Sequence, residues 1–207
     1  MKPYYEHGGI TIYHGDCREV LPTLAPVDLV LTDPPYGHGE LWQGGTWGAA
    51  SMYAQEARRW DADKFPDVTL DIVRKAGSGV VIWGGNYYSL PPSRCWLAWD
   101  KTQKIPTLAD FELAWTNLDR PSKSFSESRN PDGNGQRQHP TQKPLSLFVW
   151  CFTFFPECQT VVDPFMGSGT TLRAAKDLGR RAIGIEIEER YCEIAAKRLS
   201  QEVLQFA

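Results

Sequence analysis

The sequence of 207 residues contains no apolar run that approaches about 18 residues, the length that indicates a membrane-spanning helix. No signal peptide opens the chain. The five cysteines are odd in number, scattered and without a Cys-x-x-Cys pair, which argues against a disulfide framework and a zinc site. These absences predict a cytoplasmic protein with reduced thiols and no bound metal.

An excess of basic charge is also absent. The net charge is −3 and the isoelectric point about 5.8, so the chain as a whole is not a basic coat for nucleic acid. Any contact with nucleic acid has to come from a local patch. Hydrophobic residues make up 42% of the chain and charged residues 23%, which is typical of a globular protein. This length and composition predict one domain that spans residues 1–207.

A short apolar run at residues 27–31 has the length of a strand and ends at two consecutive prolines. Asp33, Pro34, Pro35 and Tyr36 therefore stand together at a strand end, where ligands bind in open α/β sheets. The Asp33 carboxylate and the Pro34 carbonyl can accept the N–H groups of a base, and Tyr36 offers a face for stacking. Two such acceptors favour a tetrahedral amino nitrogen whose lone pair can attack a methyl donor. The alternative is a strand followed by a tight turn with a packed tyrosine.

A second motif follows the strand expected at residues 160–162. Residues 163–171 read Asp-Pro-Phe-Met-Gly-Ser-Gly-Thr-Thr and precede a helix expected at 172–178 and a strand at 181–185 that ends at Glu186. The glycines allow close approach of a ligand to the backbone, and the helix beyond them presents free N–H groups to a carboxylate. Glu186 can accept from both hydroxyls of a ribose.

Phosphate binding is disfavoured at this second motif. It has no Gly-Lys-Ser/Thr sequence, and Asp163 would repel a pyrophosphate. A nucleoside with a zwitterionic amino-acid tail fits better, because Asp163 can hold its ammonium group. S-adenosylmethionine (SAM) is such a ligand.

The remaining segments supply further elements and two candidate contact regions. Strands are expected at residues 10–13, 79–83, 95–99 and 111–115, and helices at 66–75, 145–155 and 188–199. A Gly-rich loop at 38–50 carries Trp42 and Trp47, which either stack on a ligand or lie on an ordinary surface loop.

Residues 116–143 are the least regular stretch of the sequence. Their basic side chains outnumber the acidic ones, so this stretch is either a phosphate-contacting segment or a solvated loop, and the context favours the first. The candidate contacts to nucleic acid are Trp42, Trp47, Arg120, Lys123, Arg129, Arg137 and His139.

Together the two motifs, residues 33–36 and residues 163–171, resemble those of the amino-group DNA methyltransferases, which modify adenine N6 or cytosine N4. The catalytic motif precedes the cofactor motif, which is similar to the circularly permuted β-type order of that family. Residues 139–147 resemble the segment before the cofactor strand, and residues 14–17 resemble the motif that meets the adenine of the cofactor. The resemblance implies an α/β fold with a Rossmann-like, seven-stranded mixed sheet, and it implies SAM as the cofactor.

The resemblance also implies roles for single residues. It makes Asp33, Pro34, Pro35 and Tyr36 the catalytic candidates, with double-stranded DNA as the partner and a flipped-out base as the target. It places the following residues around the cofactor: Asp16, Cys17, Asp33, Thr141, Lys143, Asp163, Pro164, Phe165, Gly167, Ser168, Gly169, Thr170 and Glu186. No covalent adduct with the base is needed, so the cysteines are not candidate nucleophiles.

Asp at position 33 favours adenine N6 as the target, since relatives with Ser there more often act on cytosine N4. An RNA adenine methyltransferase can use the same residues, and a non-catalytic subunit that keeps the cofactor belongs to a different class. A protein glutamine methyltransferase usually has Asn at the first position and the cofactor motif first. Only residues 116–138 and 38–50 are available for target recognition, which predicts a short recognition sequence or relaxed specificity, with a homodimer as one means to extend it.

Overall fold

The computed structural model describes residues 1–38, 61, 64–106, 108–129 and 143–201, and a single mixed sheet runs through this part of the chain. Its strands lie in the order β1-β2-β9-β8-β3-β4-β6-β5-β7. The strands are β1 (Tyr5–His7), β2 (Ile10–His14), β3 (Val27–Thr32), β4 (Gly77–Trp83), β5 (Trp96–Lys101), β6 (Phe111–Thr116), β7 (Lys123–Glu127), β8 (Thr160–Asp163) and β9 (Arg181–Glu186).

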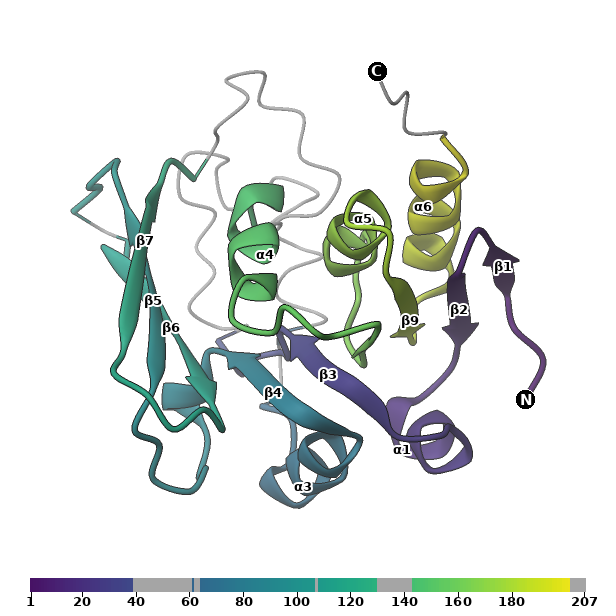
Figure 1. Ribbon diagram of the computed structural model, residues 1–207, viewed down its shortest axis with the longest axis horizontal. Coiled ribbons are helices and arrows are strands. Elements are labelled where there is room, and N and C mark those ends of the chain that lie inside the picture. The colour runs from purple at the N-terminus through teal and green to yellow at the C-terminus, as the bar shows by residue number, and fades with distance from the viewer. Residues whose placement is uncertain (39–60, 62–63, 107, 130–142, 202–207) are drawn as a thin grey trace.

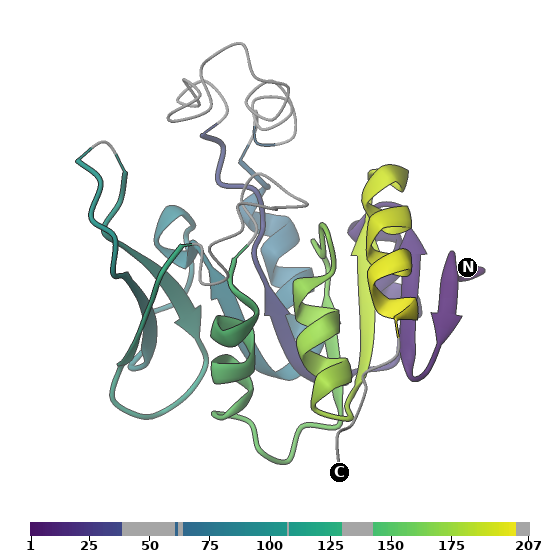
Figure 2. The same ribbon diagram turned by 90° about the horizontal axis from the view of Figure 1, so that it is seen from above.

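Helices cover both faces of this sheet. They are α1 (Cys17–Val20), α3 (Asp67–Lys75), α4 (Leu145–Phe152), α5 (Thr170–Asp177) and α6 (Glu189–Ser200), with 3₁₀ turns η1 (Leu21–Thr23) and η4 (Gly85–Tyr87). Figures 1 and 2 show α4, α5 and α6 side by side on one face and α3 on the other. In the described residues, no helix is long and apolar enough to cross a membrane.

Each face of the sheet has its own hydrophobic core. The core on one face includes Leu147, Phe152 and Leu172 from the α4 and α5 side, and the core on the other includes Leu70 and Val73 from α3. The central strand β3 is buried along nearly its whole length because it is covered on both faces. These two layers hold the carboxyl ends of the central strands in fixed positions.

The expected α/β fold with a large mixed sheet is present. The described residues add two strands to the seven that were expected, β1 and β7, and these lie at the two edges of the sheet. Residues 116–143 were predicted to be irregular, and this is wrong for Lys123–Glu127, which pair in parallel with β5. The strand is polar because it lies at an edge, with only one alternating apolar residue, Phe125, packed against the core. Helix α4 is also shorter than predicted, since it ends at Phe152.

Candidate active site

The carboxyl ends of five neighbouring strands meet at one edge of the sheet. Strands β2, β9, β8, β3 and β4 are parallel, so the residues that follow them share that edge. Crossovers on the two sides of β8 and β3 run over opposite faces, through α5 and α3, which makes the β8–β3 boundary a topological switch point. There, Thr32 Oγ1 donates a hydrogen bond to Asp163 Oδ1 at 2.7 Å. The two sequence motifs are therefore joined directly.

A cavity of about 310 Å³ opens at this boundary, a size that suits a small-molecule site. Asp33 and Pro35 line it from the end of β3, and Asp163 and Phe165 line it from the end of β8, which confirms that the two motifs converge on one cleft. The predicted cofactor residues that line it are Asp16, Cys17, Asp33, Lys143, Asp163, Pro164, Phe165, Gly167, Ser168, Thr170 and Glu186. Thr141 lies outside the described residues.

The Gly-rich turn after β8 forms the floor of this cavity. Gly167 and Gly169 have φ angles of +49° and +78°, a region that favours glycine. The Gly169 position is also crowded, because an added Cβ would lie 3.0 Å from the Cβ of Ala195 in α6. Arg198 of α6 donates to the Ser168 carbonyl oxygen and to Thr170 Oγ1, both at 3.3 Å. This support by Arg198 was not predicted, because Arg198 lies on a helix about 30 residues further along the chain.

The buried carboxylate of Asp163 and the partly buried carboxylate of Glu186 face the cavity among neutral donors. Asp163 accepts from the hydroxyls of Thr32 and Thr171 and from the Phe165 backbone N–H, and burial raises its pKa to about 6. Glu186 accepts from the backbone N–H groups of Gly167 at 3.0 Å and Glu188 at 2.9 Å, and burial raises its pKa to about 7. Both groups are ready to accept further hydrogen bonds or a positive charge.

The charge of the cavity wall suits a cationic ligand. Five acidic residues line it (Asp16, Asp33, Asp163, Glu186 and Glu188), against two basic ones, Arg18 and Lys143. A nucleoside that carries a sulfonium and an ammonium group fits this wall, with Glu186 placed to hold a ribose diol and Asp163 to hold the ammonium. The residues present therefore fit SAM.

Asp16 and Cys17 occupy the other end of the cavity. Asp16 Oδ1 accepts from the Arg18 backbone N–H at 2.8 Å and caps α1, and Asp16 also forms an ion pair with the Arg18 guanidinium. The side-chain hydrogen bond from Arg18 lowers the pKa of Asp16. Burial raises the pKa of the Cys17 thiol to about 12, so this thiol stays protonated and is a poor nucleophile.

The Asp33 carboxylate is held by two donors. Tyr36 donates its hydroxyl to Asp33 Oδ1, and the Lys143 ammonium donates to Asp33 Oδ2 and, at 3.1 Å, to the Tyr36 hydroxyl oxygen. Burial raises the pKa of Asp33, and the Lys143 charge opposes this shift. Lys143 was expected to lie around the cofactor. It does line the cavity, and it is also the direct partner of the Asp33 carboxylate.

Three residues that sequence reasoning missed hold the turn in place. Gly84 leaves room for the Tyr36 ring, since an added Cβ would lie 2.0 Å from Tyr36 Cε1. The Tyr88 hydroxyl donates to the Pro35 carbonyl oxygen. Asp61 Oδ1 accepts from the backbone N–H groups of Tyr36 at 2.6 Å and Gly37 at 2.9 Å. Only Gly84 had a local signal, the Gly-Gly pair directly after a buried strand.

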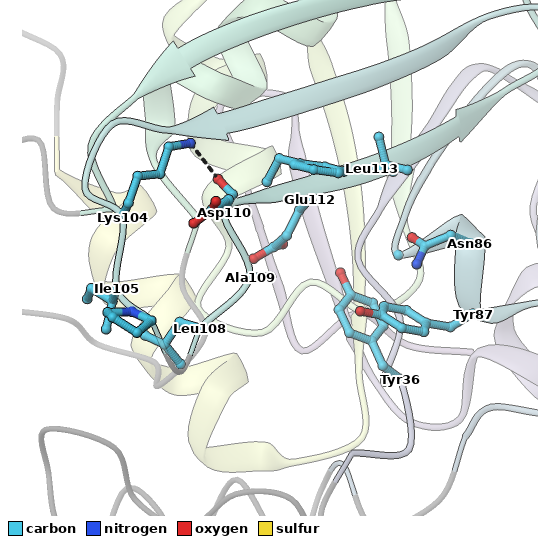
Figure 3. A pocket seen from close by; sticks show the side chains of 13 residues that line it. Tyr36, Asn86, Tyr87, Lys104, Ile105, Leu108, Ala109, Asp110, Glu112 and Leu113 are labelled. Carbon is cyan, nitrogen blue, oxygen red and sulfur yellow. Dashed lines mark hydrogen bonds between the residues drawn. The ribbon is translucent and has the colours of Figure 1, made fainter.

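A second and larger cavity, of about 680 Å³, lies on the other side of the catalytic motif (Figure 3). Tyr36, Tyr87 and Glu112 point into it, and the loop between β5 and β6 forms its far wall. The centres of the Tyr36 and Tyr87 rings are 5.0 Å apart with an angle of 34° between the ring planes. Asp33 lines the first cavity and Tyr36 the second, so the catalytic motif forms part of the wall of both.

The predicted contacts to nucleic acid are distributed unevenly. Arg129 follows β7 and donates to the Ala109 carbonyl oxygen at 2.6 Å, at the wall of the second cavity. Lys123 stands at the opposite end of β7, opposite Leu97 in the sheet register, and the Arg120 guanidinium packs over Phe154. The structure thus brings Arg129 to the site, and it does not bring Arg120 or Lys123 there. Trp42, Trp47, Arg137 and His139 lie outside the described residues.

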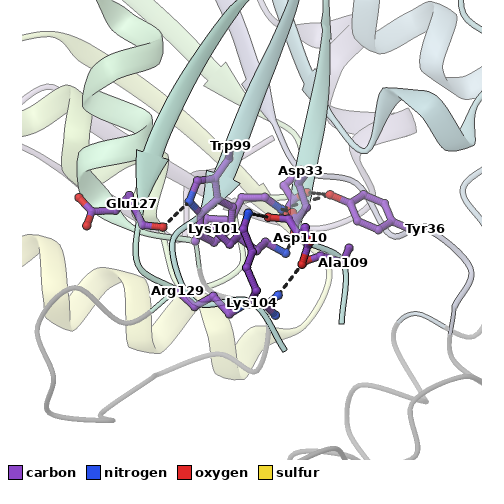
Figure 4. Close-up of polar contacts among 11 residues, drawn as sticks. Asp33, Tyr36, Trp99, Lys101, Lys104, Ala109, Asp110, Glu127 and Arg129 are labelled. Carbon is purple, nitrogen blue, oxygen red and sulfur yellow. Dashed lines mark hydrogen bonds and ion pairs between the residues drawn. The ribbon is translucent and has the colours of Figure 1, made fainter. Parts of the chain in front are cut away.

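Buried charges from β5 and β6 complete the catalytic corner, and the sequence analysis did not identify them. Glu112 Oε2 lies 3.1 Å from Lys143 Nζ, and its other oxygen pairs with Lys101 Nζ. Burial alone would raise the pKa of Glu112, but Lys143 and Lys101 outweigh it and hold the pKa well below its ordinary value. Figure 4 shows Lys101 at Trp99, and its Nζ lies 5.0 Å from the centre of the Trp99 ring.

This sheet, with a nucleoside-sized cavity at the switch point, is the fold of the SAM-dependent methyltransferases. Residues 82–197, more than half of the chain, match the profile of the N6/N4 DNA methylases. The chain belongs to this DNA methylase family. That match begins after residues 33–36, and the similarity to individual relatives covers the motif region as well.

Several relatives carry descriptions of their activity. The type II methyltransferase M.HinfI of Haemophilus influenzae is 28% identical over 92% of this chain and 68% of its own length. The type II methyltransferase M2.DpnII of Streptococcus pneumoniae is 27% identical over 97% of this chain and 93% of its own length. The alignment to M.HinfI spans 251 positions and this chain has 207 residues, so at least 44 aligned positions (251 minus 207) have no counterpart here.

Solved structures agree with the fold. M1.HpyAVI in complex with SAM is 25% identical, has a TM-score of 0.54 and covers 93% of this chain and 100% of its own. The PvuII DNA methyltransferase, which is cytosine-N4-specific, is 20% identical with a TM-score of 0.65, over 99% of this chain and 91% of its own. At 20% identity, this second similarity concerns the fold alone.

Proposed function

We propose that this chain transfers the methyl group of SAM to the N6 amino group of an adenine that is flipped out of double-stranded DNA. The observation that carries the proposal is the position of the catalytic motif between two cavities. Asp33 lines the acidic cavity that fits SAM, and Tyr36 lines the cavity on the other side. A base in the second cavity would place its amino group beside Asp33, at the boundary with the cavity that fits SAM.

The catalytic residues have separate tasks in this proposal. The Asp33 carboxylate accepts a hydrogen bond from the exocyclic amino group, which localises the nitrogen lone pair. The Pro34 carbonyl accepts the second amino hydrogen, and the Tyr36 ring stacks on the base. When bound, SAM supplies an electrophilic methyl group. The extra proton on the product nitrogen leaves by way of Asp33 to water.

The second cavity suits a flipped base on several counts. Aromatic rings line it, and Asn86 supplies amide donors and acceptors for the base edge. Extruding a base from the duplex costs a few kcal/mol, which stacking on aromatic side chains offsets at roughly 1–3 kcal/mol per base. The Arg129 side chain, at the wall of this cavity, is placed to contact a DNA phosphate.

Adenine is proposed over cytosine because Asp stands at position 33. The 44 or more aligned positions that M.HinfI has and this chain lacks support a compact recognition region. We therefore propose a short recognition sequence or relaxed specificity, with the β5–β6 loop among the elements that read it. We also propose that residues 1–207 form a single domain and that the chain acts beside a restriction enzyme.

The test is transfer of a deuterated methyl group from SAM to duplex DNA of mixed sequence, followed by mass analysis of the released nucleosides. We expect labelled N6-methyladenine from DNA and none from matched RNA. Labelled N4-methylcytosine would overturn the choice of base, and label only in RNA would overturn the choice of nucleic acid. A chain that binds SAM and labels neither would overturn the proposed activity.

A further inference from the structure

Four alternating charges run from the catalytic motif into the sheet. Asp33 pairs with Lys143, Lys143 pairs with Glu112, and Glu112 pairs with Lys101. The side chains of Lys143 and Lys101 are only 5% and 6% exposed, and those of Asp33 and Glu112 are 22% and 25% exposed. The four residues come from the turn after β3, the segment before α4, β6 and β5, so the fold alone brings them together.

Lys143 is divided between two carboxylates. Its ammonium contacts Asp33 Oδ2 and also lies 3.1 Å from Glu112 Oε2. Asp33 Oδ1 already accepts from Tyr36, so both oxygens of Asp33 have a donor before a base arrives. A carboxylate that accepts a strong hydrogen bond from an unshared ammonium ion is a poorer acceptor for an incoming amino group. Because Glu112 also pairs with Lys143, it weakens the interaction between the Lys143 ammonium and Asp33.

We propose that Glu112 and Lys101 are positioning residues for methyl transfer, which share the Lys143 ammonium with Asp33 so that Asp33 stays ionised and still accepts a hydrogen bond from the base. The inference rests on the proposed function, because it assigns these residues to the same catalytic site. Glu112 lines the second cavity and Lys101 does not, and the role assigned to both here does not depend on a contact with the base. Both act through Lys143, and the alternating order keeps the sum of the four charges at zero.

The direction of each effect follows from the order of charges. The negative charge of Glu112 raises the pKa of Asp33, and the charge of Lys143 lowers it. Removal of Glu112 therefore lowers the pKa of Asp33 and leaves Lys143 to Asp33 alone. Removal of Lys101 takes away a positive charge at the far end, so the pKa of Asp33 rises. Removal of both returns the sum of the charges to zero and the pKa of Asp33 toward its wild-type value, while Lys143 remains paired with Asp33 alone.

Other charged and titratable groups near the four residues have to stay unchanged in the test. Tyr36 and Tyr88 interact with Asp33 from the side of the catalytic turn, and Asp163 interacts with Asp33 from the end of β8. Arg129, which follows β7, interacts with Lys101, and Cys151 of α4 interacts with Lys143.

The experiment compares Glu112→Gln, Lys101→Met and the double variant with the wild-type chain. We expect Glu112→Gln to lower kcat about tenfold, on the scale of losses seen when an orienting partner behind a functional group is removed, with the affinity for SAM unchanged. The acid limb of its pH–rate profile moves to lower pH. Lys101→Met keeps its rate at alkaline pH and moves the acid limb to higher pH. The double variant returns the pH–rate profile toward that of the wild type, because the lost charges cancel, but its kcat stays as low as that of Glu112→Gln, because Lys143 still has no second carboxylate.

A second readout needs neither cofactor nor DNA. Carbon-13 NMR of labelled aspartate carboxyls, assigned with Asp33→Asn, follows the titration of Asp33 in each folded variant. We expect a lower pKa of Asp33 in Glu112→Gln and a higher one in Lys101→Met. Glu193→Gln is the matched control, because Glu193 pairs with Lys197 at the exposed surface of α6, with side chains 58% and 75% exposed. It should change neither the pKa nor the rate.

Shifts in the same direction in both single variants, or no shift, would overturn the inference. So would a double variant that is slower than either single variant while its thermal unfolding matches theirs. A wild-type chain that transfers no methyl group overturns the proposed function instead, and in that case the NMR titration still decides whether the four charges are coupled.

Discussion

The two halves of the site treat buried charge in different ways. In the catalytic half, Asp33 and Glu112 each face a lysine, and the four charges from Asp33 to Lys101 sum to zero. In the cofactor half, Asp163 and Glu186 accept hydrogen bonds from hydroxyls and backbone N–H groups, and within the described residues neither forms an ion pair. Burial raises the pKa of both cofactor-side groups.

This difference indicates what each half is prepared for. The catalytic half carries its own counter-ions, and the Lys143 charge opposes the rise that burial causes in the pKa of Asp33. The cofactor half leaves its negative charge uncompensated, which favours a ligand that brings positive charge with it. A cationic methyl donor on one side and a neutral base on the other match this division.

The largest effect is expected at the shared wall. Asp33→Ala should lower kcat for methyl transfer by about 10²–10³-fold or more, as for other groups that stabilise developing charge, because the base loses its side-chain acceptor. Calorimetric titration should show that SAM still binds, since Asp163 and Glu186 remain. The control is Asp119→Ala, whose side chain is 86% exposed, and which should leave the rate unchanged. An Asp33→Ala variant that is still active would contradict the assignment of Asp33 to the catalytic half of the site.

A glycine pair tests the geometry of the catalytic half without any change of charge. Gly84→Ala should lower kcat about 10- to 100-fold, because the added Cβ would lie 2.0 Å from Tyr36 Cε1 and would force the Tyr36 ring to move. Gly179→Ala is the matched control: both glycines have positive φ, +66° and +68°, but the Gly179 Cβ would meet nothing within 4 Å. Both variants carry similar backbone strain, so equal losses of activity in steady-state assays would contradict the steric account.

The cofactor half should respond to pH near neutrality. A ribose diol donates to the ionised form of Glu186, whose pKa in the free protein is about 7. The affinity for SAM should therefore fall about tenfold between pH 8 and pH 6 as Glu186 takes up a proton. Calorimetry at several pH values measures this. Glu186→Gln should bind more weakly and with a much flatter dependence on pH, and a steep dependence in that variant would assign the titration to another group.

The smallest effect concerns the outer rim. Arg129→Ala should weaken binding to duplex DNA about 3- to 10-fold at moderate salt and reduce the slope of log K against log salt by about 1. Lys123→Ala, at the other end of β7, should change neither quantity. Fluorescence anisotropy over a salt series distinguishes the two variants, and equal slopes for both would mean that DNA does not approach along the wall of the second cavity.

Local motifs were predictable because neighbouring residues define them. A strand followed by Asp33-Pro34-Pro35-Tyr36, and a strand followed by the glycines of residues 167–169, can be read from a short window of sequence. The structure places both at carboxyl ends of adjacent parallel strands. The cofactor cavity was therefore largely predictable, including its acidic residue at the end of β9.

The partners of the catalytic carboxylate were not predictable in the same way. Glu112 and Lys101 lie on strands that contact the motif only through the folded sheet, and Lys143 is 110 residues from Asp33. Strand β7 was also not predicted, because it lies in the charged stretch of residues 116–143 and its Lys-Ser-Phe-Ser-Glu pattern is that of a polar edge strand. Single-sequence reasoning detects such residues as charges but not as pairs.

The most direct test of the central claim is a crystal structure of the chain with S-adenosylhomocysteine and a duplex that contains its target. The account predicts the cofactor product in the cavity between Asp16 and Glu186, an extruded adenine against Tyr36, and the adenine amino group within hydrogen-bonding distance of Asp33. A nucleoside bound elsewhere, or an extruded base that lies away from Asp33, would contradict it.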